Sequence, residues 1–352
     1  MRPLATALAL ASLGVGIALV RAELERRADR AAADGDQGRR RRPARGQGRG
    51  HTQGRGRPAL EPGEPYAEGL RRVALGQLDL AAELLEAYPG GAGEQTVHEV
   101  RKALKRLRAL LRLLRPALGA KRYARESAAL RDCARRLAGA RDAEVMAATL
   151  QALVARDPER LSGSAAVRAL QAQLWAECDA ARKHTIGDPD VRAAAVRELR
   201  EVRARVARWE LRPRGPRLLA PGLRRLYRRG RRGLRHARRE GDAGTLHLWR
   251  KHVKDLRYVA ETLDRGGAPA KRVRRVARRA DRLGEALGEE HDLALLAQGV
   301  RARSAHFAGE RATRKRLLKA IARRRRSLRK RALRDGGRLY RRAPKRFVRR
   351  LG

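Results

Sequence analysis

The sequence is short of acidic residues and of cysteines, and each shortage excludes a class of protein. Its 352 residues contain 38 Asp and Glu against 86 Lys and Arg, so the formal net charge is +48. A protein with this charge binds phosphate-rich polymers unless something shields it. Two cysteines are too few for a disulfide framework or a four-thiolate zinc site, and they suit a reducing compartment. Hydrophobic residues still make up 42% of the chain, which excludes a purely disordered basic tail.

Aromatic residues are also scarce, and this bears on which polymer is bound. The chain has 11 of them (two Phe, three Trp and six Tyr). Single-stranded nucleic acids are held largely by rings that stack on the bases, at about 1–3 kcal/mol each. Inorganic polyphosphate has no bases and needs only Arg and Lys, and the planar fork of arginine suits phosphate oxygens. The composition therefore favours polyphosphate, while duplex DNA stays open because backbone binding needs no aromatic rings.

The positive charge is concentrated in the C-terminal part of the chain. The net charge is +6 over residues 1–65, +8 over 66–210 and +34 over 211–352. Within 314–350 there are 19 basic residues and one acid, Asp335. A genome rich in arginine codons explains 75 Arg against 11 Lys, but it does not explain the deficit of acids.

The N-terminal region divides into an apolar segment and a Gly/Arg-rich linker. Residues 1–22 contain an apolar run over 4–20, near the lower limit for a membrane-spanning helix. Three interpretations remain open: a membrane anchor with the bulk of the chain in the cytoplasm, a signal peptide, or a start codon assigned too early. Residues 23–65 include a stretch rich in Gly and Arg that cannot form a core, so we expect a disordered linker.

From Tyr66 onward the sequence predicts an all-α protein. Long stretches rich in Ala, Leu, Arg and Glu lie between prolines, and no segment alternates like a strand. We expect a break near Gly139 in the third of the predicted helices. The expected helices lie near residues 66–88, 95–115, 118–156, 160–185, 188–211, 220–239, 243–264, 269–287, 289–306 and 309–334.

An internal repeat is the most informative feature of the sequence. Residues 97–108 align with 246–257 at an offset of 149, and residues 137–145 align with 287–295. A duplicated unit of about 150 residues predicts two helical bundles related by a pseudo-twofold axis. Repeat one covers about 66–212 and repeat two about 213–350.

Helical geometry gives each repeat a basic stripe opposite an apolar face. Like charges at these spacings destabilise a helix, and a bound polyanion would reverse that effect. A solvated basic face is the ordinary interpretation of one such helix, but its recurrence favours a ligand surface. The first stripe consists of His98, Arg101, Lys102, Lys105, Arg108 and Arg112. The second stripe consists of His247, Arg250, Lys251, Lys254 and Arg257.

These motifs resemble the CHAD family, the conserved histidine α-helical domain. The resemblance rests on the two His-x-x-Arg helices, on the Leu-Gly-x-x-Arg/His-Asp elements at 137–145 and 287–295, and on the segment 219–231. It spans about residues 66–350. Ala138 stands where the family has Gly, so the first element departs from the pattern. The resemblance implies two four-helix bundles around a basic groove that binds inorganic polyphosphate, often on intracellular granules in the cytoplasm.

The second element adds two weaker candidate contacts, Arg141 and His291. Asp142 and Asp292 occupy matched positions, and we expect them to orient a basic side chain or to cap the following helix rather than to act as acid and base. No phosphate-binding loop, zinc-protease motif or metal-ligand spacing is present in the sequence. We therefore expect a binding protein that uses no metal or other cofactor and is not an enzyme. The alternatives are a nucleic-acid-binding architectural protein and a polyphosphate phosphohydrolase.

The histidines that head the stripes suggest a dependence on pH. A histidine beside several basic residues is neutral until an anion arrives and then gains a proton. The sequence thus predicts that polyphosphate affinity rises as the pH falls from about 7.5 to 6. A neutral histidine held by a hydrogen bond is the alternative.

Overall fold

The structure, a computed structural model, describes residues 59–88, 93–137, 139–213, 215–264 and 267–351. All regular structure in these residues is helical, which confirms the all-α prediction. The apolar segment 4–20 and the Gly/Arg-rich stretch up to residue 58 lie outside the described residues. No helix among the described residues is long and apolar enough to cross a membrane.

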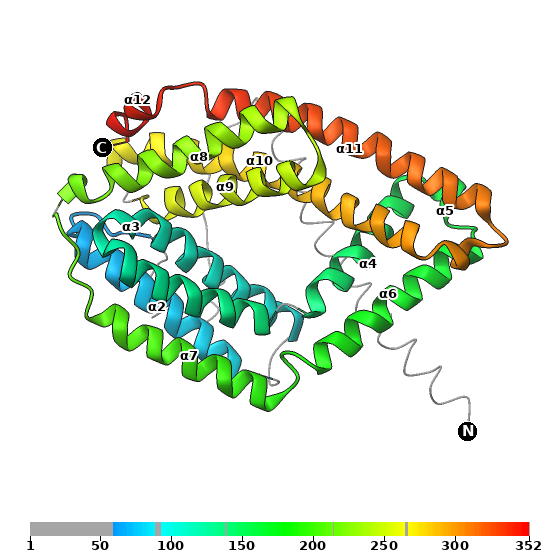
Figure 1. Ribbon diagram of the computed structural model, residues 1–352, viewed down its shortest axis with the longest axis horizontal. Coiled ribbons are helices and arrows are strands. Elements are labelled where there is room, and N and C mark those ends of the chain that lie inside the picture. Colours follow the sequence, from blue (N-terminus) through cyan, green and yellow to red (C-terminus); the bar gives the residue numbers. More distant parts are fainter. Residues whose placement is uncertain (1–58, 89–92, 138, 214, 265–266, 352) are drawn as a thin grey trace, which may run out of the picture. The chain divides into compact units, whose positions relative to one another are not determined.

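The first half of the described chain contains six helices (Figure 1). Helix α2 packs against α3 and α7, and α4 packs against α6. The helices are α2 (Tyr66–Glu86), α3 (Gly93–Arg136), α4 (Gly139–Arg156), α5 (Pro158–Leu161), α6 (Ala165–Lys183) and α7 (Pro189–Ala207).

The second half has a similar order of helices. Helix α8 packs against α9 and α11, and α10 packs against both α9 and α11 (Figure 1). The helices are α8 (Ala220–Arg239), α9 (Ala243–Thr262), α10 (Gly267–Ala302), α11 (Arg311–Leu339) and α12 (Pro344–Arg349), with short 3-10 turns η1 (Gly215–Leu218) and η2 (Ser304–Phe307).

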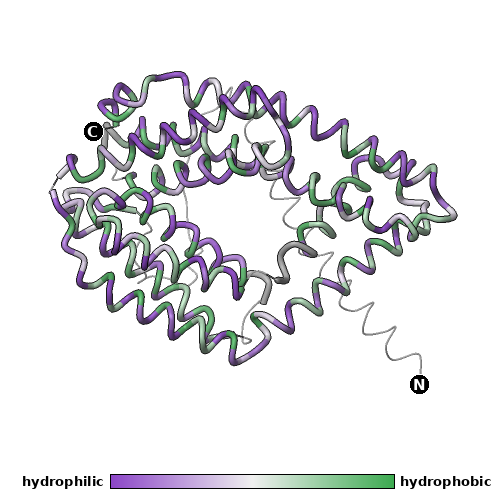
Figure 2. Tube along the Cα trace, in the orientation of Figure 1, coloured by the Kyte–Doolittle hydropathy of each residue, from purple (hydrophilic) through white to green (hydrophobic). Residues whose placement is uncertain are grey.

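Local sequence explains where several helices begin. The Ser164 hydroxyl accepts a hydrogen bond from the Val167 amide at 3.1 Å, and Asp242 caps α9 through the Thr245 amide at 3.0 Å. Prolines begin α5, α7 and α12, at positions where a missing amide hydrogen costs nothing. Hydrophilic and hydrophobic residues alternate along the helices in Figure 2, as expected of helices that each bury one face.

Three predicted helix boundaries differ from the structure. The break expected after residue 115 lies at Gly119 instead, whose φ of 76° only glycine adopts easily. The predicted division at residues 287–289 is wrong, because α10 continues unbroken through Gly288. At the C-terminus α11 extends to Leu339 and α12 follows it, both beyond the predicted end at residue 334.

The described part of the linker packs on the helices. Leu60 is only 3% exposed, and its amide donates to the carbonyl of Thr262 at 2.8 Å. Glu64 forms an ion pair with Arg72 of α2 at 2.7 Å. The linker predicted to reach residue 65 therefore ends before Leu60.

Helix α3 joins the two halves through contacts with α8 and α9. A Cβ atom at Gly222 of α8 would lie 1.8 Å from the carbonyl oxygen of Leu113, so the two backbones meet without an intervening side chain. Arg112 pairs with Asp255 of α9 at 3.0 Å, and Arg106 pairs with Glu261 at 3.9 Å. The interface is thus fixed by one close backbone approach and two ion pairs.

Candidate polyanion-binding site

The second stripe runs along α9 and faces α10. The ring of His247 lies 4.0 Å from that of His291, centroid to centroid. A Cβ atom at Gly288 would be 3.5 Å from Nε of Arg250, so Gly288 lies directly against that guanidinium. Arg257 forms ion pairs with Glu261 at 2.7 Å and with Asp281. The structure therefore brings His247, Arg250 and the predicted contact His291 together.

Burial keeps His247 neutral near pH 7. Its pKa falls to about 4, chiefly because the ring is partly desolvated and further because of His291, Lys251 and Arg250. The ring does not titrate between pH 7.5 and 6 without a bound anion. The predicted rise in affinity over that range therefore requires a bound anion to raise the pKa of the ring above about 6.

The first stripe lies on the N-terminal part of α3. His98 is exposed, and Arg101 donates from Nη1 to the carbonyl oxygen of Leu137 at 3.0 Å. Lys102 pairs with Glu99 at 3.0 Å. Arg101 thus supports the C-terminal end of α3, where an arginine can satisfy an open carbonyl.

The second element of the repeat is only partly described. Residues 141 and 142 belong to α4, but the side chains of Arg141 and Asp142 lie outside the described residues. Asp292 is half-buried in the interior of α10. A cap on a following helix is therefore wrong for Asp292, because no helix begins there.

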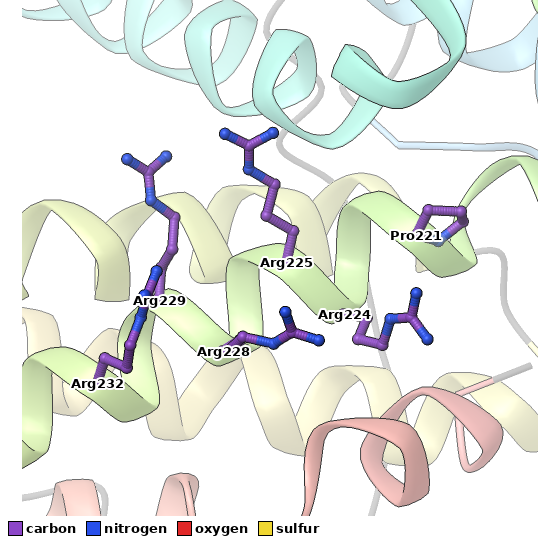
Figure 3. A pocket seen from close by; sticks show the side chains of 6 residues that line it. All are labelled: Pro221, Arg224, Arg225, Arg228, Arg229 and Arg232. Carbon is purple, nitrogen blue, oxygen red and sulfur yellow. The ribbon is translucent and has the colours of Figure 1, made fainter.

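Where α3, α8 and α9 meet, the structure brings two arginines of the first stripe, Arg108 and Arg112, together with residues of α8 and α9 that the sequence did not single out. We call this group the junction cluster: Arg108, Arg112, Arg225, Arg229, His252 and Asp255. A cavity of about 410 Å³ opens beside it on α8, lined by Pro221 and five arginines (Figure 3). The side chains of Arg225 and Arg229 are directed toward α3 in that view.

The junction cluster holds positive charge in a partly desolvated place. Nε of Arg108 is buried without a hydrogen-bond partner among the described residues. Burial and the charge of Arg112 lower the pKa of Arg108, and burial, Arg115 and Arg229 lower that of Arg225. Lowered pKa values of arginines indicate that their guanidinium groups repel one another at a place where water screens the charges only in part.

Asp255 and His252 complete the junction cluster from α9. Asp255 is 8% exposed, and burial raises its pKa although Arg112, Arg108 and Arg229 all act against the rise. The pKa of His252 falls to about 4 because of burial and then of Arg229 and Arg112. One carboxylate thus faces three arginines, which leaves an excess of positive charge for an anion.

A protein-family model for the CHAD domain matches residues 76–301. The chain belongs to the CHAD domain family. No curated protein matches the chain. The matched region of this CHAD domain includes both stripes and the junction cluster, and it ends before α11 and α12.

The α8 arginines of the CHAD domain left a signal in the sequence. Arg228 and Arg229 belong to the Tyr-Arg-Arg-Gly-Arg segment of the family resemblance, directly before the second stripe. A helical projection of this segment would have placed Leu226 and Tyr227, which are buried, on one face of the helix. The opposite face would have contained Arg225, Arg228 and Arg232. What the sequence lacks is the information that this face turns toward α3.

Two other predictions concern metals and thiols. Among the described residues, no group of three His, Cys, Asp or Glu side chains could hold a metal ion. Cys133 and Cys178 are both buried, and burial raises the pKa of Cys133 to about 12. A thiol with that pKa is unreactive at neutral pH.

Proposed function

We propose that this CHAD domain binds inorganic polyphosphate and is not an enzyme. The junction cluster carries the proposal: Arg112 repels Arg108, Arg229 repels Arg225, and Arg108, Arg112 and Arg229 share the single carboxylate of Asp255. A chain of phosphates would turn this repulsion into attraction, and arginine forks would bind its oxygens in bidentate fashion.

The surroundings of the junction cluster favour polyphosphate over single-stranded nucleic acid. The ring of Tyr123, whose hydroxyl acts on the charges of Arg108 and Arg225, already lies 4.9 Å from the guanidinium of Arg115. Stacking on bases would require free rings, whereas polyphosphate requires none. Nucleic acid and phosphohydrolase activity remain the alternatives for this site.

We infer that the two stripes belong to duplicated bundles around one groove. At the offset of 149, Arg106 corresponds to Asp255 and Arg112 to Glu261. The repeat therefore converts the pair Arg112–Asp255 into the pair Glu261–Arg106. Contacts across a twofold axis are related in the same way. The matching contacts of α2 with α3 and of α8 with α9 support the same relation.

Within this proposal the stripe residues divide their roles. Lys105, Lys251 and Lys254 present positive charge along α3 and α9, and His98 and His247 head the two stripes. Arg101 and Arg250 position the second element as well as carrying charge, because they lie against Leu137 and Gly288. The expected place of action is the cytoplasm, on polyphosphate granules, with residues 4–20 as the candidate membrane anchor.

The test is a competition at about 150 mM salt between long-chain polyphosphate and single- or double-stranded DNA of equal total charge. We expect DNA to leave labelled polyphosphate bound to the wild type, and Arg225→Gln/Arg229→Gln to weaken polyphosphate binding about tenfold or more. The matched control, Arg197→Gln/Arg208→Gln, removes two exposed charges from elsewhere and should change little. Unchanged polyphosphate binding in the junction variant, or displacement of polyphosphate from the wild type by DNA, would refute the proposal. Release of orthophosphate, with or without divalent metal, would refute the non-enzymatic part.

A further inference from the structure

A second cationic surface lies where the N-terminal half of α10 meets the C-terminal end of α11. We call it the outer arginine patch: Arg275, Arg278, Arg279, Arg282, Arg338 and Arg341. All are exposed except the half-buried Arg279. Burial and the charges of Arg275, Arg341, Arg282 and Arg338 lower the pKa of Arg279, so the rows on the two segments face the same region.

The outer arginine patch and the second stripe occupy different sides of α10. Asp281 and Gly284 face α9, where they meet Arg257 and Lys254. Arg279 and Arg282 each lie two residues away from these positions, which is about 200° around a helix. A ligand on the second stripe therefore does not cover the patch.

The outer arginine patch has almost no counter-charge. Among the described residues, no carboxylate lies within ion-pair distance of Arg275, Arg278, Arg279, Arg282 or Arg341, and Arg338 is 4.0 Å from Asp335. Stripe residues such as Lys102 and Arg257 have close carboxylate partners instead. Mutual repulsion of this kind is tolerated at a surface that meets a polyanion.

The shape of the outer arginine patch suits a wide, stiff polyanion. Its arginines form two rows on adjacent antiparallel segments, and helices packed side by side lie about 8–10 Å apart. A duplex presents a row of phosphates on each edge of its grooves, so rows of cations on two adjacent segments can contact both strands at once. The nearby rings of Tyr340 and Phe347 are buried, so no stacking platform for a single strand is present in the described residues here.

We propose that the outer arginine patch binds the phosphodiester backbone of duplex nucleic acid, without reading base sequence, at a surface separate from the junction cluster. The α11 side of the patch lies beyond the residues that match the family model. Because the patch lies on α10 and α11, whereas the junction cluster lies on α3, α8 and α9, we expect the protein to hold a duplex and a second polyanion together. The inference does not depend on polyphosphate being that second ligand.

The experiment measures binding of a labelled 24-base-pair duplex to the full chain as a function of salt. Each phosphate neutralised contributes about 0.9 to the slope of log affinity against log salt. We expect Arg275→Gln/Arg279→Gln/Arg282→Gln to lower the slope by about 2 to 3 and the affinity by about tenfold or more at 150 mM salt. The control Arg197→Gln/Arg208→Gln/Arg217→Gln removes the same charge from exposed positions elsewhere.

A second arm measures binding of the duplex in the presence of saturating polyphosphate. A third arm measures binding of the protein to vesicles of phosphatidylserine and phosphatidylcholine. We expect the wild-type protein to retain the duplex when polyphosphate is bound. Equal losses in the patch and control variants, or displacement of the duplex by polyphosphate, would overturn the inference. Loss of vesicle binding with unchanged duplex binding in the patch variant would identify a membrane surface instead. Failure of polyphosphate to bind the wild type would refute the proposed function and leave the duplex result to stand by itself.

Discussion

At the scale of single residues, the histidines show how burial changes a prediction made from sequence. His247 and His252 belong to the same helix, and both have pKa values near 4 because burial and neighbouring cations disfavour the charged ring. Sequence alone gives each the ordinary value near 6.5. In the unbound protein the two rings therefore gain their protons near pH 4 instead of near pH 6.5.

Stability should therefore depend on pH through these two rings. Between about pH 6.5 and 4 the unfolded chain binds protons that the folded protein does not, so the free energy of unfolding falls as the pH falls. Urea denaturation across this range should show a steeper loss for the wild type than for His247→Gln/His252→Gln. Parallel curves would show that the rings titrate normally in the folded protein.

Binding should move the same equilibrium in the opposite direction. A polyanion beside His252 and His247 stabilises the charged rings, so the complex should take up protons from solution near pH 5. Calorimetry in two buffers of different ionisation enthalpy measures this uptake directly. The double variant serves as the control, and equal uptake in both proteins would exclude the histidines as the source.

At the scale of the elements, a glycine decides how α8 meets α3. A Cβ atom at Gly222 would collide with the Leu113 carbonyl, which is backbone and cannot rotate away. We expect Gly222→Ala to cost about 1–3 kcal/mol of unfolding free energy. Gly76→Ala is the matched control, because Gly76 lies in α2 with open space around it and alanine should stabilise that helix by about 0.5–1 kcal/mol. Chemical denaturation of both variants tests the pair, and changes of the same sign would contradict this account.

Most of the elements follow from the sequence, and the exceptions have physical causes. Helical periodicity and prolines predicted nearly every helix, including a turn between α3 and α4. The unbroken α10 was missed because Gly288 looks like a break in sequence, whereas in the structure it lies inside α10 and packs against Arg250. The second stripe was predicted from its spacing along one helix. The junction cluster could not be, because it depends on how α3, α8 and α9 meet.

At the scale of the whole molecule, the two ion pairs between α3 and α9 differ in burial. Asp255 has a side chain only 12% exposed, whereas that of Glu261 is 30% exposed. Arg112→Ala leaves a buried carboxylate without its closest partner and should cost about 3 kcal/mol. Arg106→Ala is the matched control and should cost less than about 1 kcal/mol. Urea midpoints of the two variants measure the difference, and equal shifts would refute the assignment.

The placement of opposite charges in these two pairs also bears on whether one half could associate with a second copy of the same half. Under the proposed twofold relation, two first halves would set Arg106 against Arg112, and two second halves would set Asp255 against Glu261. Like charges would meet in both cases, whereas the mixed arrangement joins opposite charges at both places. An ancestral self-association of identical units would then have become a partnership between unlike ones. Each half would then be selective for the other, and this selectivity would disfavour the pairing of two first halves or of two second halves from different copies.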